Sequence, residues 1–145
     1  MVKAVHHVGM STADLERCIH FYRDLIGMEL LSESQTEGEA TYDALLGLQN
    51  VKARSAMLGI GSMRLELWEF EHPAGKSLQP MLPVNIPRIT HLCFEVEDIQ
   101  SDYQRLKEAG VRFHCPPQSF GGAEAVYGRD PEDNIFELVQ WSGKP

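Results

Sequence analysis

The feature of this sequence that most constrains its fold is an internal repeat. The stretch VHHVGMSTADLERCIHFYRDLIGMEL, residues 5–30, is followed later by ITHLCFEVEDIQSDYQRLKEAGVRF, residues 89–113. Both stretches read as a strand that holds a histidine, then an aspartate turn, then an amphipathic helix that stops at glycine. His7 and His91 are 84 positions apart in this alignment, so the two histidines occupy equivalent places.

The spacing of apolar residues predicts the order β-α-β-β-β in each half of the chain. In the first half we expect strands at 5–10, 28–32, 55–60 and 63–70, a helix at 15–26, and a loop with a short helical turn at 37–50. In the second half we expect strands at 89–96, 111–114, 123–127 and 135–141, and a helix at 99–109. The second copy is shorter in its middle loops.

A proline-rich segment separates the two copies. Residues 72–87, HPAGKSLQPMLPVNIP, hold four of the eight prolines and read as an extended linker. At 145 residues the chain is long enough for one compact core. We therefore expect a single α+β domain, residues 1–145, made of module 1 (1–71), the linker (72–87) and module 2 (88–145).

The repeat duplicates two kinds of metal-ligand residue. Strand alternation places His7 and His91 on the face that points away from the helix of each module. The module ends LELWEF (65–70) and FELVQW (136–141) also align, so Glu66 corresponds to Glu137. Both glutamates lie among residues expected to be half-buried, where an unpaired carboxylate is costly.

Two imidazoles and two carboxylates suit a divalent metal with positions left for water or substrate oxygens. A single strand histidine is more often a packing residue, and a single strand glutamate usually faces water. The duplication of both pairs favours one joint site with the ligands His7, Glu66, His91 and Glu137. His6 and His20 are given no role.

Four further residues are candidates for contact with a substrate, each with an alternative. Arg64 shares a strand face with Glu66 and is suited to a carboxylate or phosphate, and Trp68 is suited to an apolar wall or to core packing. Glu95 is either a spare base or the solvated end of a strand. Arg129 is either a substrate contact or a surface charge.

Composition excludes several classes of partner. The formal net charge of -8 disfavours nucleic acid and anionic membrane surfaces. No signal peptide and no apolar run of roughly 18 residues is found, so we expect an intracellular, cytoplasmic protein. The cysteines Cys18, Cys93 and Cys115 form no C-x-x-C pair and are expected to be small buried hydrophobic residues.

Taken together, these motifs resemble the vicinal oxygen chelate superfamily of glyoxalase I, methylmalonyl-CoA epimerase, fosfomycin and bleomycin resistance proteins, and extradiol dioxygenases. The most specific piece is DPEDNIFEL, residues 130–138, which is similar to the family's D-P-x-G-N-x-x-E-L. Asp133 stands where the family most often has glycine, and aspartate tolerates the backbone of such a turn.

The resemblance implies paired βαβββ modules whose sheets curl into an open, mixed-sheet barrel around a metal site. It implies that His7, Glu66, His91 and Glu137 are the ligand positions, with one divalent ion (Ni, Co, Zn, Mn or Fe) per site. It also implies a homodimer, in which each site is built from one chain or from two.

The implied function is a metal-dependent lyase or isomerase of the glyoxalase type. Such an enzyme removes a proton next to a metal-bound carbonyl of a hemithioacetal or an acyl-CoA-like substrate, with Glu137 or Glu66 as the base. The alternatives are a bleomycin-resistance-like binder that works without metal, an extradiol-type dioxygenase and a fosfomycin thiol transferase. The complete four-residue ligand set disfavours each of them.

Overall fold

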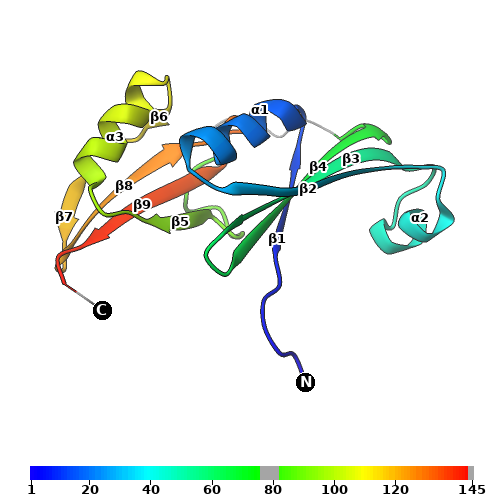
Figure 1. Ribbon diagram of the computed structural model, residues 1–145, viewed down its shortest axis with the longest axis horizontal. Helices are drawn as coiled ribbons and strands as arrows, with labels where there is room; N and C mark the ends of the chain where they lie inside the picture. Colours follow the sequence, from blue (N-terminus) through cyan, green and yellow to red (C-terminus); the bar gives the residue numbers. More distant parts are fainter. Residues whose placement is uncertain (76–81, 144–145) are drawn as a thin grey trace. The chain divides into compact units, whose positions relative to one another are not determined.

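The protein folds into two compact units, each with its own open β-sheet. The structure, a computed structural model, describes residues 1–75 and 82–143. The units are Met1–Leu78 and Gln79–Pro145, and both are mixed α+β (Figure 1). In the described part of the chain, no helix is long and apolar enough to cross a membrane.

The first unit is a four-stranded sheet with the order β1-β4-β3-β2. Its elements are β1 (Val8–Thr12), α1 (Leu15–His20), the π-helix η1 (Phe21–Leu25), β2 (Glu29–Glu37), α2 (Ala40–Leu46), β3 (Lys52–Ile60) and β4 (Met63–His72). Strand β1 runs parallel to β4, and the other pairings are antiparallel.

The second unit is a five-stranded sheet with the order β5-β9-β8-β6, in which β7 also pairs with β8. Its elements are β5 (His91–Glu95), α3 (Ile99–Glu108), β6 (Arg112–Phe113), β7 (Gln118–Phe120), β8 (Ala123–Arg129) and β9 (Ile135–Trp141). Its first strand, β5, runs parallel to its last strand, β9.

The two predicted aspartate turns start the helices α1 and α3. The Asp14 carboxylate accepts from the Arg17 amide and the Asp98 carboxylate accepts from the Ser101 amide, each at 3.0 Å. These bonds satisfy helix-terminal donors that otherwise lack a partner. The predicted helix 15–26 differs at its end, where it widens into η1 and the Ile26 amide donates to the carbonyl of Phe21, five residues back, at 3.0 Å.

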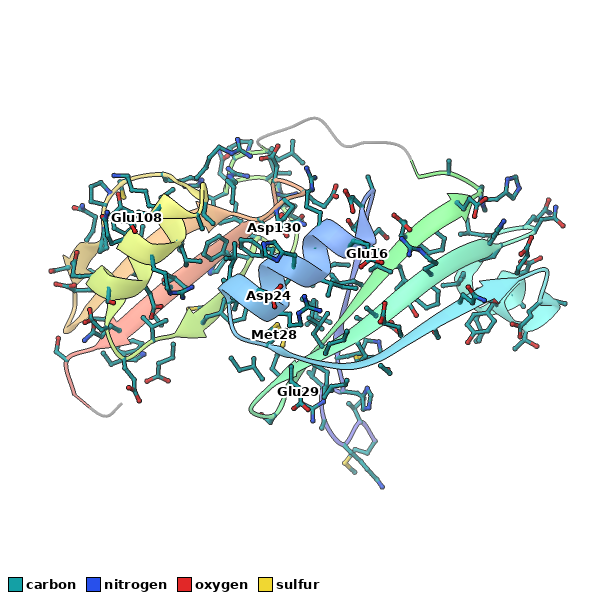
Figure 2. The ribbon with its side chains drawn as sticks, turned by 45° about the horizontal axis from the view of Figure 1, so that its top comes forward. Glu16, Asp24, Met28, Glu29, Glu108 and Asp130 are labelled. Atoms are coloured by element: carbon teal, nitrogen blue, oxygen red, sulfur yellow. The ribbon has the colours of Figure 1, made fainter. Side chains whose placement is uncertain are left out.

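Helices α1 and α3 each pack on one face of the sheet in their own unit, so the opposite face is not covered by these helices. Helix α1 packs on β3 and β4, and the β4 side chains of Leu65 and Leu67 are buried while Glu66 between them is only half-buried. Glu16 and Asp24, labelled in Figure 2, are exposed on the helical segment. Alternation therefore directs Glu66 away from α1, as the sequence predicted.

Several predicted boundaries are wrong, mainly at sheet edges. Strand β2 runs on to Glu37, and β7 was not predicted. His72 belongs to β4 rather than to the linker, of which residues 76–81 lie outside the described residues. These edge segments are polar and exposed, so they lack the apolar alternation that marks a strand in sequence.

The cysteine prediction holds at one position of three. Cys18 is buried in α1, but Cys93 and Cys115 are exposed. Cys93 lies on the sheet face that α3 leaves uncovered, and Cys115 follows the short strand β6.

Gly128 in β8 is expected to be intolerant of even one added methyl group. A Cβ at this position would lie 2.5 Å from Cζ of Phe136, because the Phe136 ring packs directly on the glycine backbone. We expect Gly128→Ala to lower the free energy of unfolding by about 1–3 kcal/mol, as measured by urea denaturation. Gly9→Ala is the matched control, since a Cβ there meets no atom within 4 Å. Equal effects of the two substitutions would show that the close contact with Phe136 does not matter.

Candidate functional site

The first unit brings together one predicted histidine and one predicted glutamate. His7 lies directly before β1, and its Nε2 is 3.4 Å from Oε2 of Glu66. Glu66 lies in the middle of the sheet, opposite Gly9 of β1 and Met57 of β3. The side chains of His7 and Glu66 are 38% and 24% exposed, so solvent or a ligand can reach the pair.

The second unit contains the corresponding pair in a tighter arrangement. Nε2 of His91, the first residue of β5, is 3.1 Å from Oε2 of Glu137 in β9. The side chains are 26% and 13% exposed. Each half-buried glutamate thus has an imidazole beside it. A carboxylate with a polar neighbour costs less to bury than the unpaired carboxylate considered in the sequence analysis.

The other ring nitrogen of each histidine also has a partner, which the sequence reasoning missed. Nδ1 of His7 is 2.8 Å from Nδ1 of His6, and Nδ1 of His91 is 2.8 Å from Oγ1 of Thr90. In both units the partner is the residue immediately before the histidine. The available signal was this adjacency, repeated in both copies of the motif.

Two neutral side chains flank Glu137 on its sheet. Cys93 of β5 and Tyr127 of β8 are its partners in the strand register. Partial desolvation, followed by the charge of Glu137, raises the pKa of Cys93 to about 12, and the same two causes raise the pKa of Tyr127. Both groups therefore stay protonated at neutral pH and add no charge beside the carboxylate.

Tyr127 also touches the histidine of this pair. The ring centroids of His91 and Tyr127 are 5.0 Å apart, so Tyr127 packs against the imidazole while it lies opposite Glu137. Sequence reasoning missed this residue because it requires the register of the β8–β9 hairpin around the DPEDN turn.

The substrate candidates of the first unit lie on the same strand face as Glu66. Arg64 donates to the carbonyls of Gly61 and Met63 at 3.2 and 2.9 Å, so its guanidinium is partly engaged by the β3–β4 hairpin. Trp68 stacks on Phe70 with ring centroids 5.7 Å apart. The face beside Glu66 therefore offers a cation on one side and an aromatic surface on the other.

The candidates of the second unit differ in exposure. Glu95 is exposed at the end of β5. Arg129 is only 7% exposed, and it donates to the carbonyls of Leu82 and Asp133 at 3.0 and 2.8 Å and to Nε2 of His114 at 3.0 Å. The surface-charge alternative for Arg129 is therefore wrong, and the guanidinium is used within the fold.

The predicted ligands occur as two histidine–glutamate pairs, one in each unit. Across residues 1–75 and 82–143, no group of three or more His, Cys, Asp or Glu side chains that could hold a metal ion is found. The donor chemistry of the pairs, imidazole nitrogen with carboxylate oxygen, suits divalent ions such as zinc, manganese and iron.

Comparison with known proteins identifies close relatives over most of the chain. The ethylmalonyl-CoA/methylmalonyl-CoA epimerase of Cereibacter sphaeroides is 32% identical over 113 residues, which cover 77% of this chain and 75% of the relative. The crystal structure of a glyoxalase family protein from Bacillus cereus superposes with a TM-score of 0.89 at 25% identity, covering 98% of this chain and 97% of that one.

A more distant structure shares the fold. The fosfomycin resistance protein FosX from Listeria monocytogenes, solved with Mn(II) and sulfate, has a TM-score of 0.66 at 18% identity and covers 99% of this chain and 95% of its own. The chain also matches a protein family over residues 4–138. Because that match spans most of the sequence, the protein belongs to the Glyoxalase/Bleomycin resistance protein/Dioxygenase superfamily, as the motifs in its sequence predicted.

Proposed function

We propose that this protein is a divalent-metal-dependent lyase or isomerase that removes a proton next to a carbonyl group of a small molecule. The observation that carries the proposal is the histidine–glutamate pair in each unit, with Nε2 to Oε2 distances of 3.4 and 3.1 Å. Two such pairs supply the two nitrogen and two oxygen ligands that a divalent ion with open coordination positions requires.

In this proposal His7, Glu66, His91 and Glu137 hold one divalent ion per site. When bound, the ion would supply Lewis-acid polarisation of the substrate carbonyl. The proposed site combines one pair from each copy of the predicted repeat. The two pairs meet either within one chain or across a homodimer. Mn(II), which FosX holds, is the first ion to test among Ni, Co, Zn, Mn and Fe.

Glu137 is the proposed base. Its side chain is less exposed than that of Glu66, 13% against 24%, so a proton transferred to it is better shielded from bulk water. The proton passes from the substrate carbon to a Glu137 carboxylate oxygen. In an isomerisation Glu137 returns it to the neighbouring carbon. In an epimerisation the opposite face of the same carbon is protonated by a second acid, for which Glu66 is the candidate.

The substrate class follows from the residues around the pairs and from the relatives. Arg64 is suited to a carboxylate or phosphate, and Trp68 with Phe70 to an apolar group. Glu95, which is exposed at the end of β5, is proposed as a secondary polar contact. The epimerase from Cereibacter sphaeroides acts on acyl-CoA thioesters according to its name, so acyl-CoA thioesters and hemithioacetals are the substrates to screen.

Metal binding is the experiment that tests this function. After chelation and re-addition of Mn(II), elemental analysis is expected to show about one tightly held ion per site. We expect Glu66→Gln and His91→Ala each to weaken metal binding at least about 100-fold, since loss of an outer-shell partner alone costs 10–100-fold.

The controls are a glutamate and a histidine outside the pairs. Glu29 in β2, labelled in Figure 2, and His20 in α1 are both exposed, so Glu29→Gln and His20→Ala are expected to bind metal as the unmodified protein does. A Glu66 or His91 variant that keeps full metal occupancy removes that residue from the site. No binding of any divalent ion would overturn the catalytic proposal and leave a non-catalytic small-molecule binder.

A further inference from the structure

Each histidine of the two pairs has a neighbouring side chain at both of its ring nitrogens. Nε2 faces the glutamate, and Nδ1 lies 2.8 Å from the side chain of the preceding residue, His6 in the first unit and Thr90 in the second. His6 and Thr90 are 84 positions apart in the sequence, the same shift that relates His7 to His91. The arrangement is therefore duplicated with the repeat, although the two partner residues differ in type.

The shared property of these partners is that each can donate or accept a hydrogen bond at the contacting atom. A threonine hydroxyl carries one proton and two lone pairs, and Nδ1 of histidine is a donor in one tautomer and an acceptor in the other. A backbone carbonyl or a carboxylate at the same place would only accept.

This property matters because Nε2 must present a lone pair to a metal ion, which places the ring hydrogen on Nδ1. While Nε2 carries the hydrogen, Nδ1 has only a lone pair and needs a donor. Once the Nε2 lone pair is given to a metal, Nδ1 carries the hydrogen and needs an acceptor. His6 and Thr90 meet both requirements without moving, so the ring keeps Nε2 on the side of the glutamate in both states.

We propose that His6 and Thr90 are positioning residues that orient His7 and His91 for a divalent ion, an inference that rests on the proposed function. Neither is a ligand. Their role is to keep the imidazole in one orientation and to accept the Nδ1 hydrogen when Nε2 is used. The half-buried Thr90 is expected to matter more than His6, because His6 and His7 are both exposed and water competes for their contact.

Paired substitutions at Thr90 separate the hydroxyl from the shape of the side chain. Thr90→Val removes the hydroxyl from a side chain of nearly the same volume, whereas Thr90→Ser keeps it. In titrations of the full chain with Mn(II), we expect Thr90→Val to weaken binding about 10–100-fold and Thr90→Ser to remain near the unmodified protein. Unchanged affinity in Thr90→Val, or equal loss in both variants, would overturn the role of the hydroxyl.

The same design applies to His6. His6→Asn retains a group that can donate or accept near the Nδ1 position, and His6→Phe keeps a ring without one. We expect a smaller loss of Mn(II) affinity in His6→Phe and recovery in His6→Asn. If His6→Phe binds Mn(II) as well as the unmodified protein, His6 has no positioning role.

A measurement on the metal-free protein separates this inference from the proposed function. With the imidazoles neutral, ¹⁵N NMR is expected to show a hydrogen-bonded Nδ1 in His91, which takes the chemical shift of a free ring nitrogen in Thr90→Val but not in Thr90→Ser. If the unmodified protein binds no Mn(II), the proposed function fails and these spectra alone decide whether Thr90 orients His91. An Nδ1 signal that is identical in all three proteins would overturn the inference whatever the metal result.

Discussion

Replacing Glu137 by glutamine is expected to lower the rate of proton transfer about 10²–10⁴-fold, which is the usual contribution of a positioned general base. The amide has nearly the same shape as the carboxylate but cannot take a proton from carbon. The side chain of Glu137 is only 13% exposed and lies between the neutral groups of Cys93 and Tyr127. These surroundings make Glu137 a stronger candidate base than Glu66.

The measurement is the incorporation of solvent deuterium next to the carbonyl of whichever acyl-CoA thioester or hemithioacetal the protein turns over. Because Glu137 is also a proposed ligand, the variant must be assayed at saturating Mn(II), with metal occupancy determined in the same sample. A Glu137→Gln protein that holds metal but exchanges deuterium at the original rate would show that another residue is the base. Glu66→Gln, assayed in the same way, is then the next variant to examine.

The strand faces of Glu66, His91 and Glu137 could be predicted from strand alternation, whereas His7 lies directly before β1, so the predicted strand 5–10 is wrong at this position. Leu65 and Leu67 are buried under α1, and their apolar character was sufficient to place Glu66 on the other face. In β9 the predicted range 135–141 agrees with the structure. A residue whose direction is set by its immediate neighbours can be located from sequence.

Features that depend on long-range contacts could not be predicted. The contact of Tyr127 with His91 requires the pairing of β8 with β9 and of β9 with β5. For Arg129 the sequence left open a substrate contact or a surface charge, whereas the side chain is buried and donates hydrogen bonds to backbone carbonyls and to His114. The π-helix at Phe21–Leu25 could not be predicted either, because the spacing of apolar residues continues through it unchanged.

The turn that leads into β9 is expected to be a major source of stability, and Asp130→Ala tests it. Asp130, labelled in Figure 2, is 2% exposed and follows β8. Its Oδ1 accepts from the amides of Glu132 and Asn134 at 2.9 and 2.8 Å, and its Oδ2 accepts from the Asn134 side chain at 3.0 Å. Removal of the carboxylate takes away the acceptor of these three hydrogen bonds, so we expect the free energy of unfolding to fall by about 3 kcal/mol.

The variant Asp130→Asn separates the contributions of the two carboxylate oxygens to the free energy of unfolding. The amide oxygen can still accept from both backbone amides, while the amide nitrogen cannot accept from Asn134, so the expected loss in urea denaturation is only about 1–2 kcal/mol. Equal losses in the alanine and asparagine variants would show that the backbone amides do not stabilise the turn.

The turn also contains Asp133 with φ 64°, a left-handed conformation that the superfamily motif usually gives to glycine. The Asp130 bonds to Glu132 and Asn134 therefore hold the backbone on both sides of a residue with a less favourable conformation, directly before the strand that carries Glu137.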